Sequence, residues 1–295
     1  MPLVIGTRAS QLALAQTNRV RHLLAEMRIE TTVRHIATDG DAVTGVPLHM
    51  IGGQGVFVRA LDDAILRGDC DLAVHSMKDI PAKRPAGVTT AAVLSRDSPA
   101  DFLVTSVENP QVIGSSSTRR RAQLLRHDPG LDVKPLRGNI DTRLRRLTEG
   151  RFDGIVLAEA GIDRLGLRVE GKRLSPDDFV PSTNQGTIAV VSRDDSGLAA
   201  VLADALDDPV SRRETVLERT VMEELGGGCF TPIGCWCRDG RLIAEVLSLD
   251  GIRWVRREKS IESVDEARSF GRALRDEAAI LIREAYERLS LTDGG

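Results

Sequence analysis

Short apolar runs alternate along most of the chain with longer segments in which apolar residues recur every three or four positions. Residues 3–6 and 71–75 are short apolar runs, which are typical of buried strands. Residues 12–27 and 56–67 carry the helical spacing, and Ser10 stands in the N-cap position before the first of them. Strands joined by helical crossovers predict an α/β fold with largely parallel sheets.

The same order of strand, polar loop and helix recurs in the middle of the chain. Ile113 leads into the polar loop 114–118, and residues 119–126 have helical spacing. A further helix is expected at residues 141–149 and a strand at residues 154–158. This region therefore predicts a second α/β unit.

The pattern changes in the last third of the chain. Residues 241–249 and 252–261 look like two strands joined at Asp250-Gly251, a hairpin signal, and a helix is expected at residues 264–288. An antiparallel sheet covered by a helix is a separate α+β domain. We therefore expect three domains: residues 1–94 with 187–207, residues 95–186, and residues 208–295.

Length and composition agree with a multidomain globular protein. The chain has 295 residues, about twice the typical length of one domain. Hydrophobic residues make up 41% and charged residues 28%, which excludes the disordered and low-complexity classes. The formal net charge of −3 provides no overall field for nucleic acid or an anionic membrane, so neither is expected as a partner.

Cysteine content and the first residues bear on location. The 4 Cys are too few and too unevenly placed for a disulfide framework, which favours a reducing compartment. The first residues lack a basic segment followed by an apolar one, and no run of about 18 apolar residues occurs. We expect a cytoplasmic protein, and a monomer because no long apolar strand edge or heptad seam stands out.

Positive charge is concentrated in residues 115–146, which we call the basic segment. It holds nine Lys or Arg and three Asp, so it carries +6 while the rest of the chain carries −9. Such an island in an acidic protein points to a polyanionic ligand. Nucleic acid is a weaker candidate because aromatic residues make up only 3% of the chain.

Candidate anion-binding residues follow several predicted strands. Ligands of parallel α/β sheets bind at the carboxyl ends of strands, where helix N-termini present N–H groups to anions. Four segments place suitable side chains there: Arg8 with Ser10; Lys78; Ser115 to Ser117 with Arg119 and Arg120; and Arg137 with Arg143. For the other helical arginines a solvated face is the simpler interpretation. These are Arg121, Arg126, Arg145 and Arg146.

Asp79 is an acid among these cations, directly after Lys78 and before Ile80-Pro81. A catalytic carboxylate and a residue that only closes a turn are equally good interpretations of Asp79 taken alone.

Cys229 follows three glycines, Gly226 to Gly228, which leave a sulfur accessible to a ligand. Zinc binding by Cys229, Cys235 and Cys237 is an alternative. The C-x5-C-x-C spacing is not a usual ligand pattern and no convincing fourth ligand lies nearby, so we expect no metal.

Four segments carry a resemblance to a known family: residues 6–14 (GTRASQLAL), 74–81 (VHSMKDIP), 136–139 (LRGN) and 227–234 (GGCFTPIG). Together and in this order they resemble the porphobilinogen deaminases, also called hydroxymethylbilane synthases. The resemblance extends from residue 4 to about residue 236, and beyond that it holds only in architecture.

The resemblance implies a three-domain enzyme whose first two domains are α/β domains like those of periplasmic binding proteins. It implies a transferase of porphyrin and heme biosynthesis that joins four porphobilinogen molecules head to tail, with loss of ammonia, into linear hydroxymethylbilane. A family cysteine carries a dipyrromethane cofactor, built from two substrate units, through a thioether; Cys229 matches it. The aspartate of the family's Lys-Asp pair is catalytic and matches Asp79.

The resemblance also implies a set of residues that contact carboxylates of cofactor and substrate. They match Arg8, Ser10, Lys78, Ser117, Arg119, Arg120, Arg137 and Arg143. Each pyrrole carries an acetate and a propionate, so a growing chain is the polyanion that the basic segment favours. The sequence departs from the family at Met50 and Gln54, where many members have lysine, and at Thr118, where leucine is common.

The alternative is a non-catalytic two-domain protein that binds or senses a small polycarboxylate. It explains the arginines, but it explains neither Asp79 behind Lys78 nor Cys229 behind three glycines.

Overall fold

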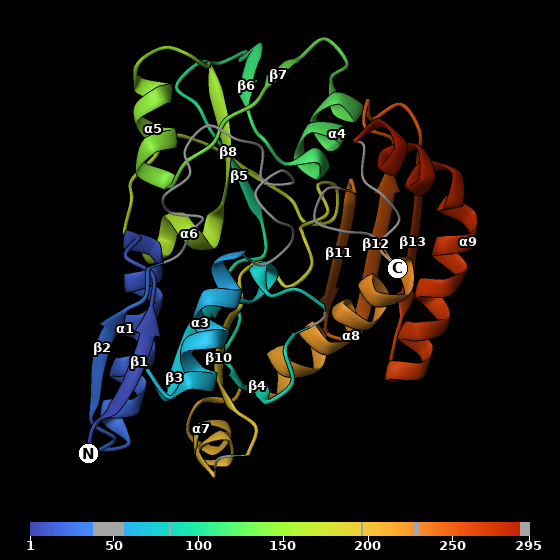
Figure 1. Cartoon of the computed structure of the whole chain (residues 1–295). Coiled ribbons are helices and arrows are strands. Elements are labelled where there is room, and N and C mark those ends of the chain that lie inside the picture. The colour runs from blue at the N-terminus through green and yellow to red at the C-terminus, as the bar shows by residue number, and fades with distance from the viewer. Residues whose placement is uncertain (38–55, 83, 196, 227–230, 290–295) are drawn as a thin grey trace. The chain divides into compact units, whose positions relative to one another are not determined.

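The structure is a computed structural model that describes residues 1–37, 56–82, 84–195, 197–226 and 231–289 (Figure 1). It divides into two compact units. The first comprises residues 1–97 and 186–213, and the second comprises residues 98–185 and 214–295. None of the described helices combines the length and apolar character needed to span a membrane.

The first unit contains a five-stranded mixed sheet in the order β2-β1-β3-β10-β4. Three strands are mutually parallel, namely β1 (Leu3–Thr7), β2 (Thr31–His35) and β3 (Leu72–Ser76). The returning strand β10 (Ile188–Arg193) is antiparallel to both β3 and β4 (Val88–Val93). The chain therefore leaves this sheet after β4 and returns as β10, which lies between β3 and β4.

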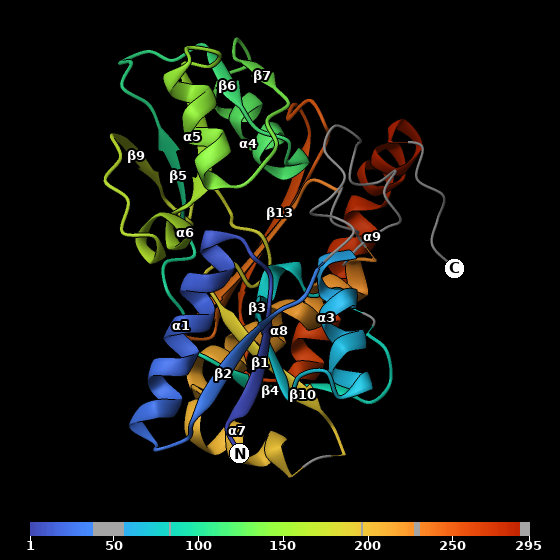
Figure 2. The same cartoon turned by 60° about the vertical axis from the view of Figure 1, so that its left-hand side comes forward.

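Helices cover both faces of this sheet. Apolar residues of α1 (Gln11–Glu26) and α7 (Leu198–Leu206) share one core cluster with Ile5 and Leu72. Residues of α3 (Val56–Arg67) form a second cluster with Ala73. Because successive side chains of a strand point to opposite faces, Leu72 and Ala73 mark the two sides of the sheet. Figure 2 shows α1 and α3 on opposite sides of it.

The second unit contains another five-stranded mixed sheet, in the order β7-β6-β8-β5-β9. The parallel strands are β6 (Val112–Gly114), β7 (Asp132–Lys134) and β8 (Gly154–Ala158). Strand β5 (Asp101–Val104) is antiparallel to both of its neighbours, β8 and the edge strand β9 (Gly171–Leu174). Its helices are α4 (Thr118–His127), α5 (Ile140–Thr148) and α6 (Glu159–Arg164).

The same unit contains an antiparallel three-stranded sheet. Its strands are β11 (Ile233–Arg238), β12 (Arg241–Leu247) and β13 (Trp254–Ser260). The helices α8 (Pro209–Leu225) and α9 (Val264–Arg288) contribute to its core. A Cβ on Gly251 would lie 2.2 Å from the Ala122 carbonyl oxygen, so the β12–β13 turn packs tightly against α4.

The predicted fold class is confirmed: two sheets rich in parallel strands and a C-terminal sheet with its helix. The helix expected at residues 264–288 has the observed bounds. The short helix α6 was not predicted, and neither was the antiparallel strand of each α/β sheet, β10 or β5, nor the edge strand beside it, β4 or β9.

Candidate functional site

The predicted site residues that the structure describes follow strands and lie at or near helix starts, and they fall into one group in each unit. Arg8, Ser10, Lys78 and Asp79 belong to the first unit, and the remaining arginines and Ser117 belong to the second. Cys229, Met50 and Gln54 lie outside the described residues.

Arg8 and Ser10 lie in the turn between β1 and α1. Ser10 is the N-cap of α1, as predicted, and its Oγ accepts a hydrogen bond from the Ala13 amide at 3.3 Å. The Thr17 hydroxyl, on the second turn of α1, donates to the Thr7 hydroxyl at the end of β1 at 2.9 Å, which joins the helix to the strand. Arg8 is half-buried beside this turn.

Lys78 and Asp79 lie on a single 3₁₀ turn, Met77–Asp79, directly after β3. The neighbouring side chains of Met77 and Ile80 are buried, and the Met77 amide donates to the Thr187 carbonyl at 2.9 Å. These anchors fix the backbone on both sides while Asp79 is exposed and Lys78 half-buried. A fixed backbone with an exposed carboxylate suits a catalytic role better than a loose turn does.

A neutral histidine lies beneath this turn. His75 ends the buried part of β3, and burial, followed by the charges of Arg84 and Arg8, lowers its pKa to about 3. Arg84 itself forms an ion pair with Asp62, whose pKa is raised by burial. Among the described residues His75 Nε2 has no hydrogen-bond partner.

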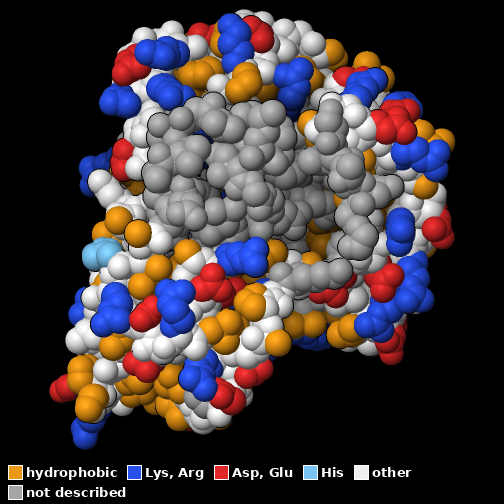
Figure 3. Space-filling view, in the orientation of Figure 1, with side chains coloured by type: hydrophobic (Ala, Val, Ile, Leu, Met, Phe, Trp, Pro, Cys, Tyr) orange, Lys and Arg blue, Asp and Glu red, His pale blue; other side chains and the backbone are white. Residues whose placement is uncertain are grey.

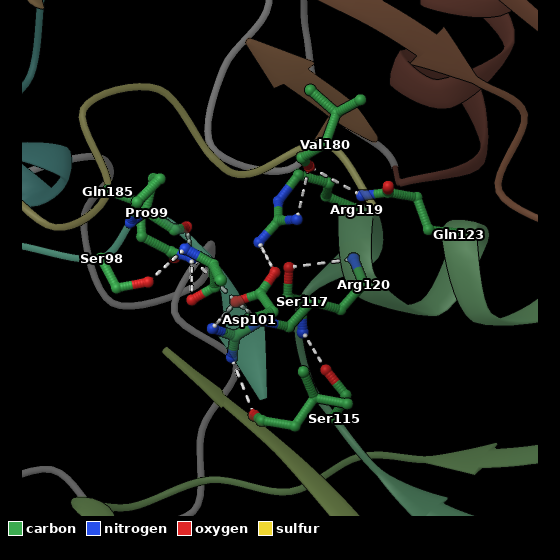
Figure 4. Close-up of polar contacts among 12 residues, drawn as sticks. Ser98, Pro99, Asp101, Ser115, Ser117, Arg119, Arg120, Gln123, Val180 and Gln185 are labelled. Carbon is green, nitrogen blue, oxygen red and sulfur yellow. Dashed lines mark hydrogen bonds and ion pairs between the residues drawn. The ribbon is translucent and has the colours of Figure 1, made fainter. Parts of the chain in front are cut away.

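In the second unit, Ser117 caps α4. Its Oγ accepts from the Arg120 amide at 3.3 Å, and its own amide donates to the Ser115 hydroxyl at 3.3 Å. The cap places Arg119 and Arg120 on the first turn, as predicted. Figure 4 shows both guanidinium groups directed toward the carboxylate of Asp101.

Asp101 is the counter-ion of both arginines. Arg119 Nη2 lies 2.7 Å from Oδ2, and Arg120 Nη2 lies 2.7 Å from Oδ1. The other end of each guanidinium donates to a backbone carbonyl, Arg119 to Val180 at 2.7 Å and Arg120 to Val156 at 2.9 Å. Burial alone would raise the pKa of Asp101, but the arginine charges and hydrogen bonds hold it well below its usual range.

Sequence reasoning missed Asp101 and Gln185. Gln185 Nε2 donates to Asp101 Oδ1 at 2.9 Å and to the Pro99 carbonyl at 2.8 Å. Residues 95–102 open the second predicted domain, and nothing in their spacing indicates which carboxylate meets the arginines. The one available signal is charge, because buried arginines require a nearby acid.

Arg137 and Arg143 lie at the start of α5. Asn139 is the N-cap and accepts from the Thr142 amide at 2.9 Å. Arg143 Nε donates to the carbonyl of Gly138 at 2.8 Å, and both arginines are half-buried. Gly138 has φ +108, a conformation that favours glycine and turns the chain into the helix.

The prediction that Arg126 belongs to a solvated face is wrong. Its side chain is 12% exposed and pairs with the fully buried Glu245 at 2.7 Å, with Trp254 under the guanidinium at 5.7 Å. Arg126 is enclosed because the β12–β13 hairpin packs on α4. Arg145 is exposed as predicted. On the face drawn in Figure 3, basic and acidic side chains are interspersed.

The cysteines do not favour a metal site in the described part of the chain. Cys235 and Cys237 are buried on β11, and burial raises the pKa of the Cys70 thiol to about 11. Among the described residues no group of three His, Cys, Asp or Glu is placed to hold a metal ion.

Together these features define a class: an α/β protein with a further α+β domain and basic helix starts suited to a polyanion. Comparisons with known proteins narrow the class. The profile described as "Porphobilinogen deaminase, dipyromethane cofactor binding domain" matches residues 3–200, and "Porphobilinogen deaminase, C-terminal domain" matches residues 213–279. The chain belongs to the porphobilinogen deaminase family.

Curated relatives agree. A probable porphobilinogen deaminase of Methanosarcina acetivorans is 49% identical over 92% of this chain and 91% of its own length. The porphobilinogen deaminase of Sulfurimonas denitrificans is 38% identical over 98% and 96%. Among solved structures, a nutrient binding protein from Burkholderia cenocepacia bound to methionine aligns with a TM-score of 0.41 and 14% sequence identity. The alignment covers 72% of this chain and 94% of that protein, and we base no conclusion on it.

Proposed function

We propose that the chain is a hydroxymethylbilane synthase, a transferase that joins four porphobilinogen molecules head to tail, releases one ammonia per unit, and frees the linear tetrapyrrole by hydrolysis. The observation that carries this proposal is the family match over residues 3–200 and 213–279. The alternative, a binding or sensing protein without chemistry, is not favoured, because the two relatives described above are named as a probable porphobilinogen deaminase and a porphobilinogen deaminase. We further propose three domains with the predicted boundaries, and a cytoplasmic monomer that works in porphyrin and heme biosynthesis.

The described residues fit a dipyrromethane cofactor, which carries several carboxylates. Two buried arginines share the single carboxylate of Asp101, which leaves net positive charge at the start of α4. Arg119 Nε is buried and has no hydrogen-bond partner in the described part of the chain. An orphaned buried donor next to surplus positive charge suits an anionic group.

By the resemblance, the residues that would hold carboxylates of cofactor and substrate are Arg8, Ser10, Lys78, Ser117, Arg119, Arg120, Arg137 and Arg143. We assign Cys229 as the point of attachment through a thioether. When bound, the cofactor supplies a tethered, electron-rich pyrrole carbon as the site of chain growth. The arginines orient the carboxylates of the incoming substrate and hold its reacting carbon in place.

Asp79 is proposed as the catalytic residue. When porphobilinogen loses ammonia, positive charge develops on its pyrrole nitrogen, and an adjacent carboxylate stabilises that charge and accepts or returns a proton. The buried neighbours Met77 and Ile80 hold the backbone of Asp79 in one position. Lys78, on the same turn, is suited to bind a substrate carboxylate.

Single-turnover addition of porphobilinogen to matched holo-proteins tests the role of Asp79. Asp79→Asn removes the charge and keeps the size, so we expect a loss of about a hundredfold or more in the rate of the first bond. Asp79→Glu keeps the charge but displaces it, so its rate should lie between those of Asn and wild type. Exposed Asp204→Asn, on α7 of the same unit, is the matched control and should not change the rate.

Thermal melts of all three variants should stay near that of the wild type, because Asp79 is exposed. A wild-type rate in Asp79→Asn would reduce Asp79 to a turn residue and contradict the proposed mechanism.

A further inference from the structure

Asp101, Arg119 and Arg120 form a buried trio with unequal charge. Their side chains are 0%, 5% and 9% exposed, and two guanidinium groups face one carboxylate. The helix dipole places a partial positive charge at the start of α4, which adds to the net positive charge of the trio. Buried charge is costly unless it is compensated, so a trio with one net positive charge is not explained by stability alone.

The trio is held in one geometry. Each guanidinium is fastened at two ends, to an oxygen of Asp101 and to a backbone carbonyl: Val180 for Arg119 and Val156 for Arg120. Fastening at both ends leaves little rotational freedom, which is the condition for recognising a planar carboxylate in a fixed orientation.

Asp101 also accepts a hydrogen bond from Gln185, a residue far from it in the sequence. Gln185, the last residue of the unit's first segment, donates to Asp101 Oδ1 and to the carbonyls of Pro99 and Ala100. The carboxylate is therefore fixed by its own position at the start of β5 and by a side chain more than eighty residues away.

We propose that Asp101 is a positioning residue for carboxylate binding: it orients Arg119 and Arg120 together and leaves one positive charge for the ligand. This inference rests on the proposed function, because it takes cofactor or substrate carboxylates as the ligand. It assigns Asp101 no contact with the reacting atoms.

A purely structural ion pair is the competing explanation, and the same unit provides a control for it. Glu245 is also fully buried, and it pairs with Arg126 at the other end of α4 and, at 3.9 Å, with Arg256. Glu245→Gln and Asp101→Asn each remove one buried carboxylate from an arginine partner. Only Asp101→Asn removes a carboxylate that accepts hydrogen bonds from Arg119 and Arg120.

The experiment measures KM and kcat for porphobilinogen per holo-enzyme, the fraction of chains carrying cofactor by intact mass, and the melting temperature of the full-length protein. For Asp101→Asn we expect KM to rise about tenfold or more and the holo fraction to fall, with kcat per holo-enzyme within about threefold of wild type. Glu245→Gln should lower the melting temperature and leave KM and holo fraction unchanged.

Gln185→Met provides a second variant that keeps all three charges. It should also raise KM, but by a smaller factor of about threefold. If Asp101→Asn does not fold, Gln185→Met alone tests the positioning role of Asp101. Unchanged KM and holo fraction in the folded Asp101→Asn or Gln185→Met protein would overturn the proposal. A lower KM in Asp101→Asn would also overturn it, because surplus charge rather than orientation would then govern binding.

Failure of the proposed function gives a different result. A wild-type protein that does not convert porphobilinogen contradicts the function, whereas a wild-type protein that converts it and is matched by the variants contradicts only the role of Asp101.

Discussion

The helices α4 and α5 begin alike but treat their arginines differently. Each is capped by a polar side chain, Ser117 or Asn139, that accepts from the amide three residues ahead. Arg119 and Arg120 of α4 are buried against Asp101, whereas Arg137, just before α5, and Arg143, on α5, are half-buried.

If these arginines bind carboxylates as proposed, this difference gives them two different roles. Removing one member of a buried, hydrogen-bonded charge set costs about 3–5 kcal/mol, whereas pairs in water contribute about 0–1 kcal/mol. The α4 arginines are therefore part of the folded core and fixed before a ligand arrives. Arg137 and Arg143 are only half-buried, so their loss should reduce binding with little effect on folding.

The largest expected effect on the free energy of unfolding is at Arg119 and Arg120, the two arginines buried against Asp101. Arg120→Met leaves Asp101 with one arginine and frees the Val156 carbonyl, so the free energy of unfolding should fall by about 3–5 kcal/mol, measured by urea titration. Arg121→Met, at the next and exposed position of α4, is the control and should lie within about 1 kcal/mol of wild type. Equal losses of stability in the two variants would contradict the assignment of Arg120 to the core and of Arg121 to the surface.

Acid stability should show the second effect. The pKa of Asp101 is lower in the folded protein than in the unfolded chain, where it is about 3.9. Its contribution to stability is present above that value and is lost as pH falls below it.

Wild type should therefore lose more stability than Asp101→Asn between about pH 5 and pH 2.5. His75, whose pKa is lowered to about 3, also costs stability as pH falls below about 6.5, but it does so in both proteins and cancels in the difference. Parallel stability curves for the two proteins would show that Asp101 is not held ionised by its arginines.

The smallest stability effect is expected at α5. Arg143→Ala should change the free energy of unfolding by less than about 1 kcal/mol and raise the KM for porphobilinogen about tenfold. Arg145→Ala, whose side chain is 69% exposed on the same helix, should change neither quantity. Loss of stability in Arg143→Ala with unchanged KM would place that arginine in the core rather than in the binding surface.

Sequence pattern predicted most of the fold because its signals are local. The cap at Ser10, the hairpin at Asp250-Gly251 and the helix Val264–Arg288 each depend on neighbouring residues, and all three are observed. Strand β10 was expected only as a returning segment, because pairing between residues far apart leaves no periodic trace in a single sequence.

In the candidate site, too, only the features that depend on neighbouring residues could be predicted. Positions such as Arg119 and Arg120 follow from a helix start, and the observed helix carries them on its first turn. Their burial, the identity of Asp101 as counter-ion, and the enclosure of Arg126 by Glu245 depend on contacts across 18, 19 and 119 residues, which composition and spacing do not encode.

The central claim, a tetrapyrrole-building enzyme with its growing chain tethered to Cys229, is tested most directly by intact mass. We expect purified wild type to exceed its chain mass by a dipyrromethane unit, and brief addition of porphobilinogen to add whole pyrrole units. The extra mass should map to the peptide containing Cys229 and be absent from Cys229→Ser. A wild-type protein at bare chain mass that gains nothing with porphobilinogen, or extra mass on Cys70, Cys235 or Cys237, would contradict the account.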